Sequence, residues 1–120
     1  MVKLKIEEKE YGLRFDMYAM EMIEDEFGSM GEMMEKLQKE RSRDVITLFV
    51  ILANAELAYE GKEESVKRED LRRLKAMALK GLSRAVIAAI KEGMKSETSG
   101  GNEADDEVYD VYLAELESKN

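Results

Sequence analysis

Alternating hydrophobic and polar residues near the start of the chain predict a β-hairpin. Leu4 and Ile6 alternate with charged residues, which is the two-residue period of a strand with one buried face. A second run of the same kind contains Tyr11, Leu13 and Phe15. We expect the hairpin to cover about residues 2–15, with its turn at residues 8–10. An isolated hairpin is only marginally stable in water, so it is expected to pack against helices.

Helical periodicity follows the hairpin. Asp16 is a preferred N-cap residue, and it predicts a first helix from Met17 to Phe27 that ends at Gly28. The apolar stripe of this helix is Ala19, Met22, Ile23 and Phe27. Ser29 is expected to cap a second, shorter helix with one methionine-rich face.

Further helical segments are expected downstream. Asp44 is expected to cap a third helix that runs to about Tyr59 and is apolar nearly all round, which places it at the centre of a bundle. A charged helical region is expected to start at Ser65. We expect a break near Gly81, followed by another buried helix that begins at Leu82.

These segments predict a mainly α fold, with a single-domain bundle of four to five helices and an N-terminal β-hairpin within residues 1–95. A flexible acidic C-terminal tail is expected to follow. Its first part, residues 96–107, has the serine, glycine and acidic composition of a linker. Residues 108–118 are expected to form a short amphipathic helix, because apolar residues recur there at helical spacing. These apolar residues are Tyr109, Tyr112, Leu113 and Leu116.

Charge is distributed unevenly along the chain. The formal net charge is −8, but residues 62–95 carry 10 basic and 5 acidic residues, whereas residues 96–120 carry 8 acidic and 1 basic. The basic segment raises nucleic-acid binding as a hypothesis. It lacks interleaved aromatic residues and the chain is acidic, so no nucleic-acid partner is expected. A solvated face, or a dock for an acidic partner or for the chain's own tail, is favoured.

The composition excludes several kinds of chemistry. Histidine and cysteine are absent from the chain, which rules out serine triads, cysteine–histidine pairs and zinc motifs. The best candidate acidic cluster is Glu21, Glu24, Asp25 and Glu26. It matches no calcium loop, and no histidine completes a di-iron motif. We therefore expect no catalytic residue, no metal site and no cofactor. The apolar run Val45–Ala53 is too short to span a membrane and the first residues do not predict a signal peptide, so no membrane partner is expected.

Methionine suggests a binding surface. Six of the nine methionines lie between Met17 and Met34. Flexible, polarisable methionine side chains suit the binding of varied apolar helices, although core packing remains the alternative. The candidate partner-binding residues are Met20, Met30, Met33 and Met34, together with Tyr109, Tyr112, Leu113 and Leu116 of the tail.

One stretch of the chain resembles a known family. The segment Lys9–Phe15 (KEYGLRF), followed by a helix that ends in Glu24–Ser29 (EDEFGS), is similar to the tail assembly chaperones of long-tailed bacteriophages and prophages of Gram-positive bacteria. Members of that family have a Tyr-x-Leu-Arg-Phe-like strand and a Glu-x-Glu-Phe-Gly-like helix end. The apolar helix with Asn54 and the Tyr59-Glu60-Gly61 sequence after it also fit. The likeness covers Ile6 to about Met94.

The resemblance implies a role in virion assembly. Such proteins bind the long, helical tape-measure protein and keep it from aggregating before the tail tube polymerises. They act in the cytoplasm of the bacterial host and are absent from the mature virion. The tail tube protein is a further candidate partner, and homo-oligomerisation stays open. From the residues themselves, the acidic tail is expected to add solubility. Its separate acidity and its apolar stripe lead to the hypothesis that the helix expected at residues 108–118 occupies the client-binding groove when no client is present.

Two rival hypotheses remain. The first is a small acidic regulatory protein that binds a host protein. A regulator that mimics nucleic acid would spread its acids over the folded body, whereas the acids here concentrate in the tail. The second is an enzyme that uses carboxylates and a divalent metal.

Overall fold

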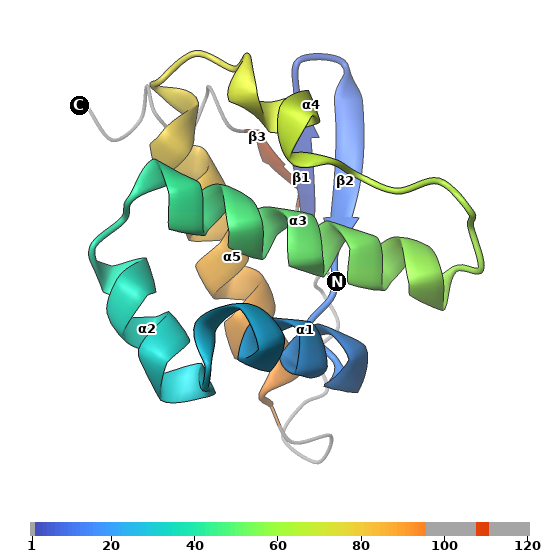
Figure 1. Cartoon of the computed structure of the whole chain (residues 1–120). Coiled ribbons are helices and arrows are strands. Elements are labelled where there is room, and N and C mark those ends of the chain that lie inside the picture. Colours follow the sequence, from blue (N-terminus) through green and yellow to red (C-terminus); the bar gives the residue numbers. More distant parts are fainter. Residues whose placement is uncertain (1, 96–107, 111–120) are drawn as a thin grey trace.

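The computed structural model describes residues 2–95 and 108–110 (Figure 1). This part of the chain forms a mainly helical fold with five helices and an N-terminal antiparallel hairpin, which confirms the predicted fold class. None of the helices in it is long and apolar enough to cross a membrane. The expected linker at residues 96–107 lies outside the described residues.

The hairpin consists of β1 (Val2–Ile6) and β2 (Lys9–Leu13). Its turn is Glu7 and Glu8, so the prediction of a turn at residues 8–10 was wrong. The register places Leu13 opposite Val2, on the buried face. A register shifted by one residue would turn the apolar side chains of one strand toward solvent, which explains why the shorter turn is formed.

The first two helices match the sequence prediction closely. Helix α1 (Met17–Phe27) is capped by Asp16, whose carboxylate accepts a hydrogen bond of 3.0 Å from the backbone of Ala19. It ends at Gly28, whose φ of 97° is a conformation that favours glycine. Ser29 caps α2 (Met30–Gln38) by accepting a 3.0 Å hydrogen bond from the backbone of Glu32.

Helix α3 (Ser42–Tyr59) is the central element, as predicted from its apolar sequence. It begins before Asp44, so Asp44 lies in the first turn and is not the N-cap. A carboxylate in that turn is favourable because it faces the positive end of the helix dipole. In Figure 1, α3 lies between α1 and α2 on one side and α4 (Arg68–Arg72) on the other.

Residues 62–67, between α3 and α4, have no regular secondary structure, so the predicted helix start at Ser65 was wrong. The side chain of Asn54 on α3 holds this segment by exchanging two hydrogen bonds with the backbone of Val66, at 3.0 and 2.7 Å. Helix α5 (Ala78–Gly93) then runs without interruption through Gly81, and the predicted break there was also wrong. Gly81 is buried in this helix, and close packing outweighs its low helix propensity.

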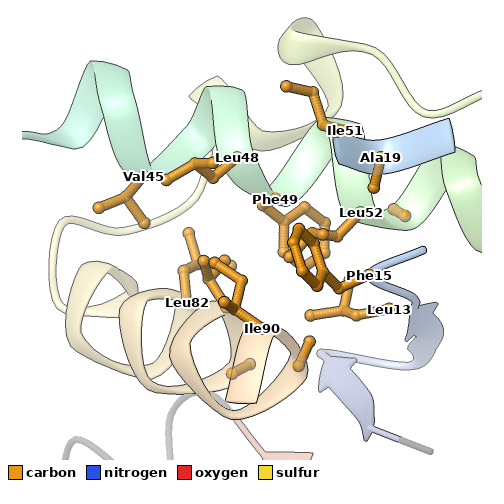
Figure 2. Packing of buried hydrophobic residues seen from close by; sticks show 14 of the residues in the cluster. Leu13, Phe15, Ala19, Val45, Leu48, Phe49, Ile51, Leu52, Leu82 and Ile90 are labelled. Carbon is orange, nitrogen blue, oxygen red and sulfur yellow. The ribbon is translucent and has the colours of Figure 1, made fainter. Parts of the chain in front are cut away.

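One core joins α3, α5 and the hairpin. Figure 2 shows side chains of α3 directed toward Leu82 and Ile90 of α5 and toward Leu13 and Phe15 at the end of the hairpin. Phe49 is fully buried at the centre of this contact. Its ring also meets Tyr11 edge to face, with the ring centroids 5.3 Å apart.

The tail contributes a third strand and not the start of a helix. Strand β3 (Val108–Asp110) pairs with β1 in parallel, with Tyr109 opposite Leu4. The prediction of a helix over residues 108–118 was therefore wrong for residues 108–110, and residues 111–118 lie outside the described residues. The free edge of β1 offers backbone hydrogen-bonding groups to an extended segment, and this tertiary opportunity overrides the local helical spacing.

Candidate functional site

Two adjoining hollows lie beside α3, bordered by α1, α4 and the start of α5. They have volumes of about 930 and 340 Å³ and share the lining residues Glu26, Thr47 and Arg68. We call the two hollows together the α3 groove, the larger hollow its basic arm and the smaller one its apolar arm. In Figure 1, α1 and α4 flank α3 on opposite sides.

The apolar arm lies between α1 and α3. Tyr18 and Met22 of α1 form one wall, and Val50 and Ile51 of α3 form the other. Tyr18 is 46% exposed and Met22 is 36% exposed, although both are large hydrophobic residues. Each precedes a residue of the buried stripe of α1 by one position, so the two side chains lie on the flank of the helix and not beneath it.

The basic arm lies between α3, α4 and the start of α5. Its floor is apolar and consists of Ile46, Leu71, Leu74, Leu79 and Leu82. Its basic residues are Arg43, Arg68, Arg72 and Lys75. Among the described residues that line it, Glu26 is the one acid. Apolar and basic side chains together suit a ligand that is amphipathic and acidic.

Arg68 lies where the two arms meet, and it is held in place. Its guanidinium donates a hydrogen bond to the hydroxyl of Thr47, which in turn donates one of 2.9 Å to the backbone carbonyl of Arg43. Asn54 fixes the segment that precedes α4 through Val66. These contacts attach α4 to α3 and give the groove a defined wall.

The methionines that sequence reasoning selected do not form the groove. Met33 is fully buried in the core, at 0% exposure. Met20 and Met30 are half-buried and pack against the core. Met34 is 43% exposed but does not line the α3 groove. Since the four are not brought together on the surface, the predicted methionine face is not the binding site that the structure offers.

The tail residues proposed for partner binding are described only in part. Tyr109 belongs to β3, beside β1. Tyr112, Leu113 and Leu116 lie outside the described residues.

Sequence reasoning missed Tyr18 and assigned Met22 to the core stripe of α1, whereas Arg68 was part of the basic segment considered as a dock for an acidic partner or for the chain's own tail. The available signal was the width of the apolar surface of that helix. The buried stripe of α1 consists of Ala19, Ile23 and Phe27. Tyr18 and Met22 add apolar surface beside this stripe, and the contact of α1 with the core does not fully bury them. The grouping of Arg68 with the apolar floor depends on how α4 crosses α3, which a linear pattern does not encode.

A second polar cluster joins the hairpin to α3. The Arg14 guanidinium donates a 2.8 Å hydrogen bond to the carboxylate of Glu56, and it stacks 3.5 Å from the centre of the Tyr59 ring. Burial raises the pKa of Glu56, a hydrogen bond with Glu60 raises it further, and Arg14 opposes both. The pKa of Glu60 is lowered, first by that same hydrogen bond. The cluster ties the hairpin to the central helix.

The acidic residues of α1 do not form a metal site. Glu21, Glu24 and Asp25 are exposed. Within residues 2–95 and 108–110, no three histidine, cysteine, aspartate or glutamate side chains are placed to hold a metal ion together. Asp25 and Glu26 instead line the apolar arm.

The chemistry of the α3 groove suits binding of an apolar or amphipathic chain. Comparisons with protein-family models, curated proteins and solved structures found no match. The function is therefore inferred from the groove and from the sequence.

Proposed function

We propose that this protein is a tail assembly chaperone of a long-tailed bacteriophage or prophage. Its client is the helical tape-measure protein, whose amphipathic segments it binds in the α3 groove before the tail tube polymerises. The observation that carries the proposal is the exposure of two large apolar side chains, Tyr18 and Met22, in a hollow beside α3. Exposed apolar surface of this kind marks interaction sites in folded proteins.

The two hollows together follow a long part of α3. Their lining residues on this helix run from Ser42 to Asn54, which is ~18 Å at 1.5 Å per residue. This is about three turns of a client helix. An amphipathic helix of that length places three or four apolar residues on one face, at spacings of three and four residues.

The groove also suits a client with many similar but non-identical helices. Met22 and Tyr18 provide polarisable and aromatic surface on the α1 side, and Val50 and Ile51 provide a rigid aliphatic surface on α3. Methionine adapts to differently shaped apolar partners because its side chain is unbranched and flexible. A tape-measure protein presents such helices repeatedly along its length.

The proposal places the protein in the cytoplasm of the bacterial host and outside the mature virion. Capture of the apolar helix faces of the client would keep the free tape-measure protein from aggregating. The tail tube protein is the second candidate partner, as the family resemblance implies.

The proposal expects a long helical protein to be encoded next to this chain. The direct test is co-expression with that protein, or with a helical fragment of it, followed by affinity purification. We expect the client to stay soluble and to co-purify in a fixed ratio. Met22→Lys places a charge in the apolar arm, and we expect it to reduce the recovered client at least ~10-fold, because desolvating a lysine costs more than about 1.4 kcal/mol.

Met17→Lys is the matched control. Met17 is on the same helix and is 71% exposed, but it does not line the α3 groove. It should leave client recovery unchanged. An insoluble client with nothing co-eluting would contradict the chaperone proposal, and equal losses in the two variants would contradict the assignment to the groove.

A further inference from the structure

The basic arm of the α3 groove has a chemistry that the apolar arm lacks. Arg43, Arg68, Arg72 and Lys75 surround a floor of leucine and isoleucine side chains. Basic residues beside apolar ones favour a ligand that carries acidic groups beside its apolar ones. Basic groups around an apolar floor add charge complementarity to hydrophobic binding.

We propose that the basic arm binds residues 111–120 of this same chain. This segment contains the apolar residues Tyr112, Leu113 and Leu116. Two acidic residues, Glu115 and Glu117, flank Leu116 in the sequence. The pattern is therefore apolar and acidic, which is the complement of an apolar floor with a basic rim.

Strand β3 brings this segment to the folded body. Asp110, its last residue, is opposite Lys5 of β1, so the ten residues that follow are tethered to the hairpin. Ten extended residues reach ~33 Å, which is about the diameter of a domain of this size. The basic arm is therefore within reach of the tethered segment.

Because residues 111–120 are attached to the folded body, even a weak interaction is sufficient for them to occupy the basic arm. A short flexible connection gives an effective concentration on the order of millimolar. A site with a dissociation constant of about 0.1 mM for the free segment would then be roughly nine-tenths occupied in the intact chain, which weakens the binding of a competing peptide ~10-fold. Charge acts in the same direction, since residues 111–120 carry two acids, Glu115 and Glu117, and one base, Lys119, whereas the lining of the basic arm carries four bases and one acid.

The consequence is self-occupancy of the groove. Residues 111–120 cover the basic arm until another ligand displaces them, and any client that uses this arm binds in competition with the tail. This proposal concerns the chain alone and stands whether or not the client is a tape-measure protein.

The experiment compares the full chain with a variant that ends at Asp110, which keeps β3. The probe is a fluorescently labelled synthetic peptide with the sequence of residues 111–120, and the measurement is fluorescence anisotropy. We expect the peptide to bind the truncated variant at least ~10-fold more tightly than the full chain, because the tethered segment competes. Equal affinities, or no binding to the truncated variant, would overturn the proposal.

The location is tested in the truncated variant by two substitutions on neighbouring residues. Arg72→Glu reverses a charge in the basic arm and should weaken peptide binding ~10-fold or more. Arg73→Glu makes the same change next to it, at an exposed residue that does not line the arm, and should have little effect. Equal effects of the two substitutions would overturn the assignment to this arm.

A full-length variant guards against misfolding of the truncated chain. Leu113→Asp with Leu116→Asp keeps the length but removes the apolar residues of the segment. It should bind the peptide as tightly as the truncated variant does. Binding as weak as that of the unmodified full chain would contradict the proposal.

Discussion

Arg14 connects the hairpin to the central helix through a single side chain. It lies just after β2, its backbone N–H donates to the carbonyl of Leu52 at 3.1 Å, and its guanidinium pairs with Glu56. Glu56 is buried on α3, and its pKa is raised from 4.5 mainly by burial, with Arg14 acting in the opposite direction. The ion pair therefore reduces the cost of a buried carboxylate.

Arg14→Met should make the stability of the protein depend on pH. Without the guanidinium the pKa of Glu56 rises further, so at neutral pH folding must either bury an unpaired charge or take up a proton. We expect a loss of about 1–3 kcal/mol at neutral pH, since Arg14 is partly exposed. The loss should shrink as the pH falls through the raised pKa toward 4.5, where Glu56 is protonated. Urea unfolding across this range measures it.

The control for this prediction is the double variant Arg14→Met with Glu56→Gln. It has no carboxyl at position 56, so its difference from Glu56→Gln alone should not vary with pH in this window. Glu56 and Arg14 both lower the pKa of Glu60, so every protein in this comparison also carries Glu60→Gln, which removes that titration. If Arg14→Met destabilised the protein equally at every pH, the Arg14 side chain would not be stabilising the charged form of Glu56.

At the scale of elements, the sequence predicted what local chemistry determines. The caps at Asp16 and Ser29 and the stop at Gly28 were located correctly, because each depends on residues within one turn. The continuation of α5 through Gly81 and the formation of β3 were not predicted. Both depend on surfaces supplied by distant parts of the chain, and such contacts override local propensity.

A contact between elements also determines the role of Gly93 at the end of α5. A Cβ added there would lie 2.3 Å from the carbonyl oxygen of Phe15 and 2.7 Å from its Cβ. Alanine is the better helix former by roughly 1 kcal/mol. At position 93, however, its Cβ would overlap with Phe15, and relieving this overlap requires a shift of the backbone. We expect Gly93→Ala to lower the free energy of unfolding by about 1–3 kcal/mol, measured by chemical denaturation.

Gly31→Ala provides the comparison. A Cβ at Gly31 in α2 would approach only the Ser29 hydroxyl, at 3.9 Å. The same substitution should stabilise the protein there, by about 0.5–1 kcal/mol, through helix propensity. If Gly93→Ala were also stabilising, the close approach of α5 to the end of the hairpin would not exist.

At the scale of the whole molecule, sequence reasoning identified the type of site but not its residues. Methionine enrichment indicated an adaptable apolar surface, and α1 does contribute one through Met22. Met33 instead packs in the core, and Met20 and Met30 pack against it. Which methionines stay at the surface depends on how α1 and α2 lie on α3, and that is a property of the assembled fold.

The same assembly places basic and apolar side chains in the α3 groove. Arg68 and Arg72 come from a short helix that Asn54 positions through Val66, and Met22 comes from another part of the chain. The central claim is that this α3 groove, and no other surface, receives a helical client.

The most direct measurement is a titration with a helical tape-measure fragment, followed by the NMR signals of the methionine methyl groups. The chain has nine methionines, and substitution by leucine assigns each signal. We predict that the Met22 methyl signal shifts or broadens as the fragment binds, while those of Met17 and Met34, exposed outside the groove, stay in place. Changes at Met17 or Met34 without a change at Met22 would contradict the account, and so would a spectrum that the fragment leaves unaltered.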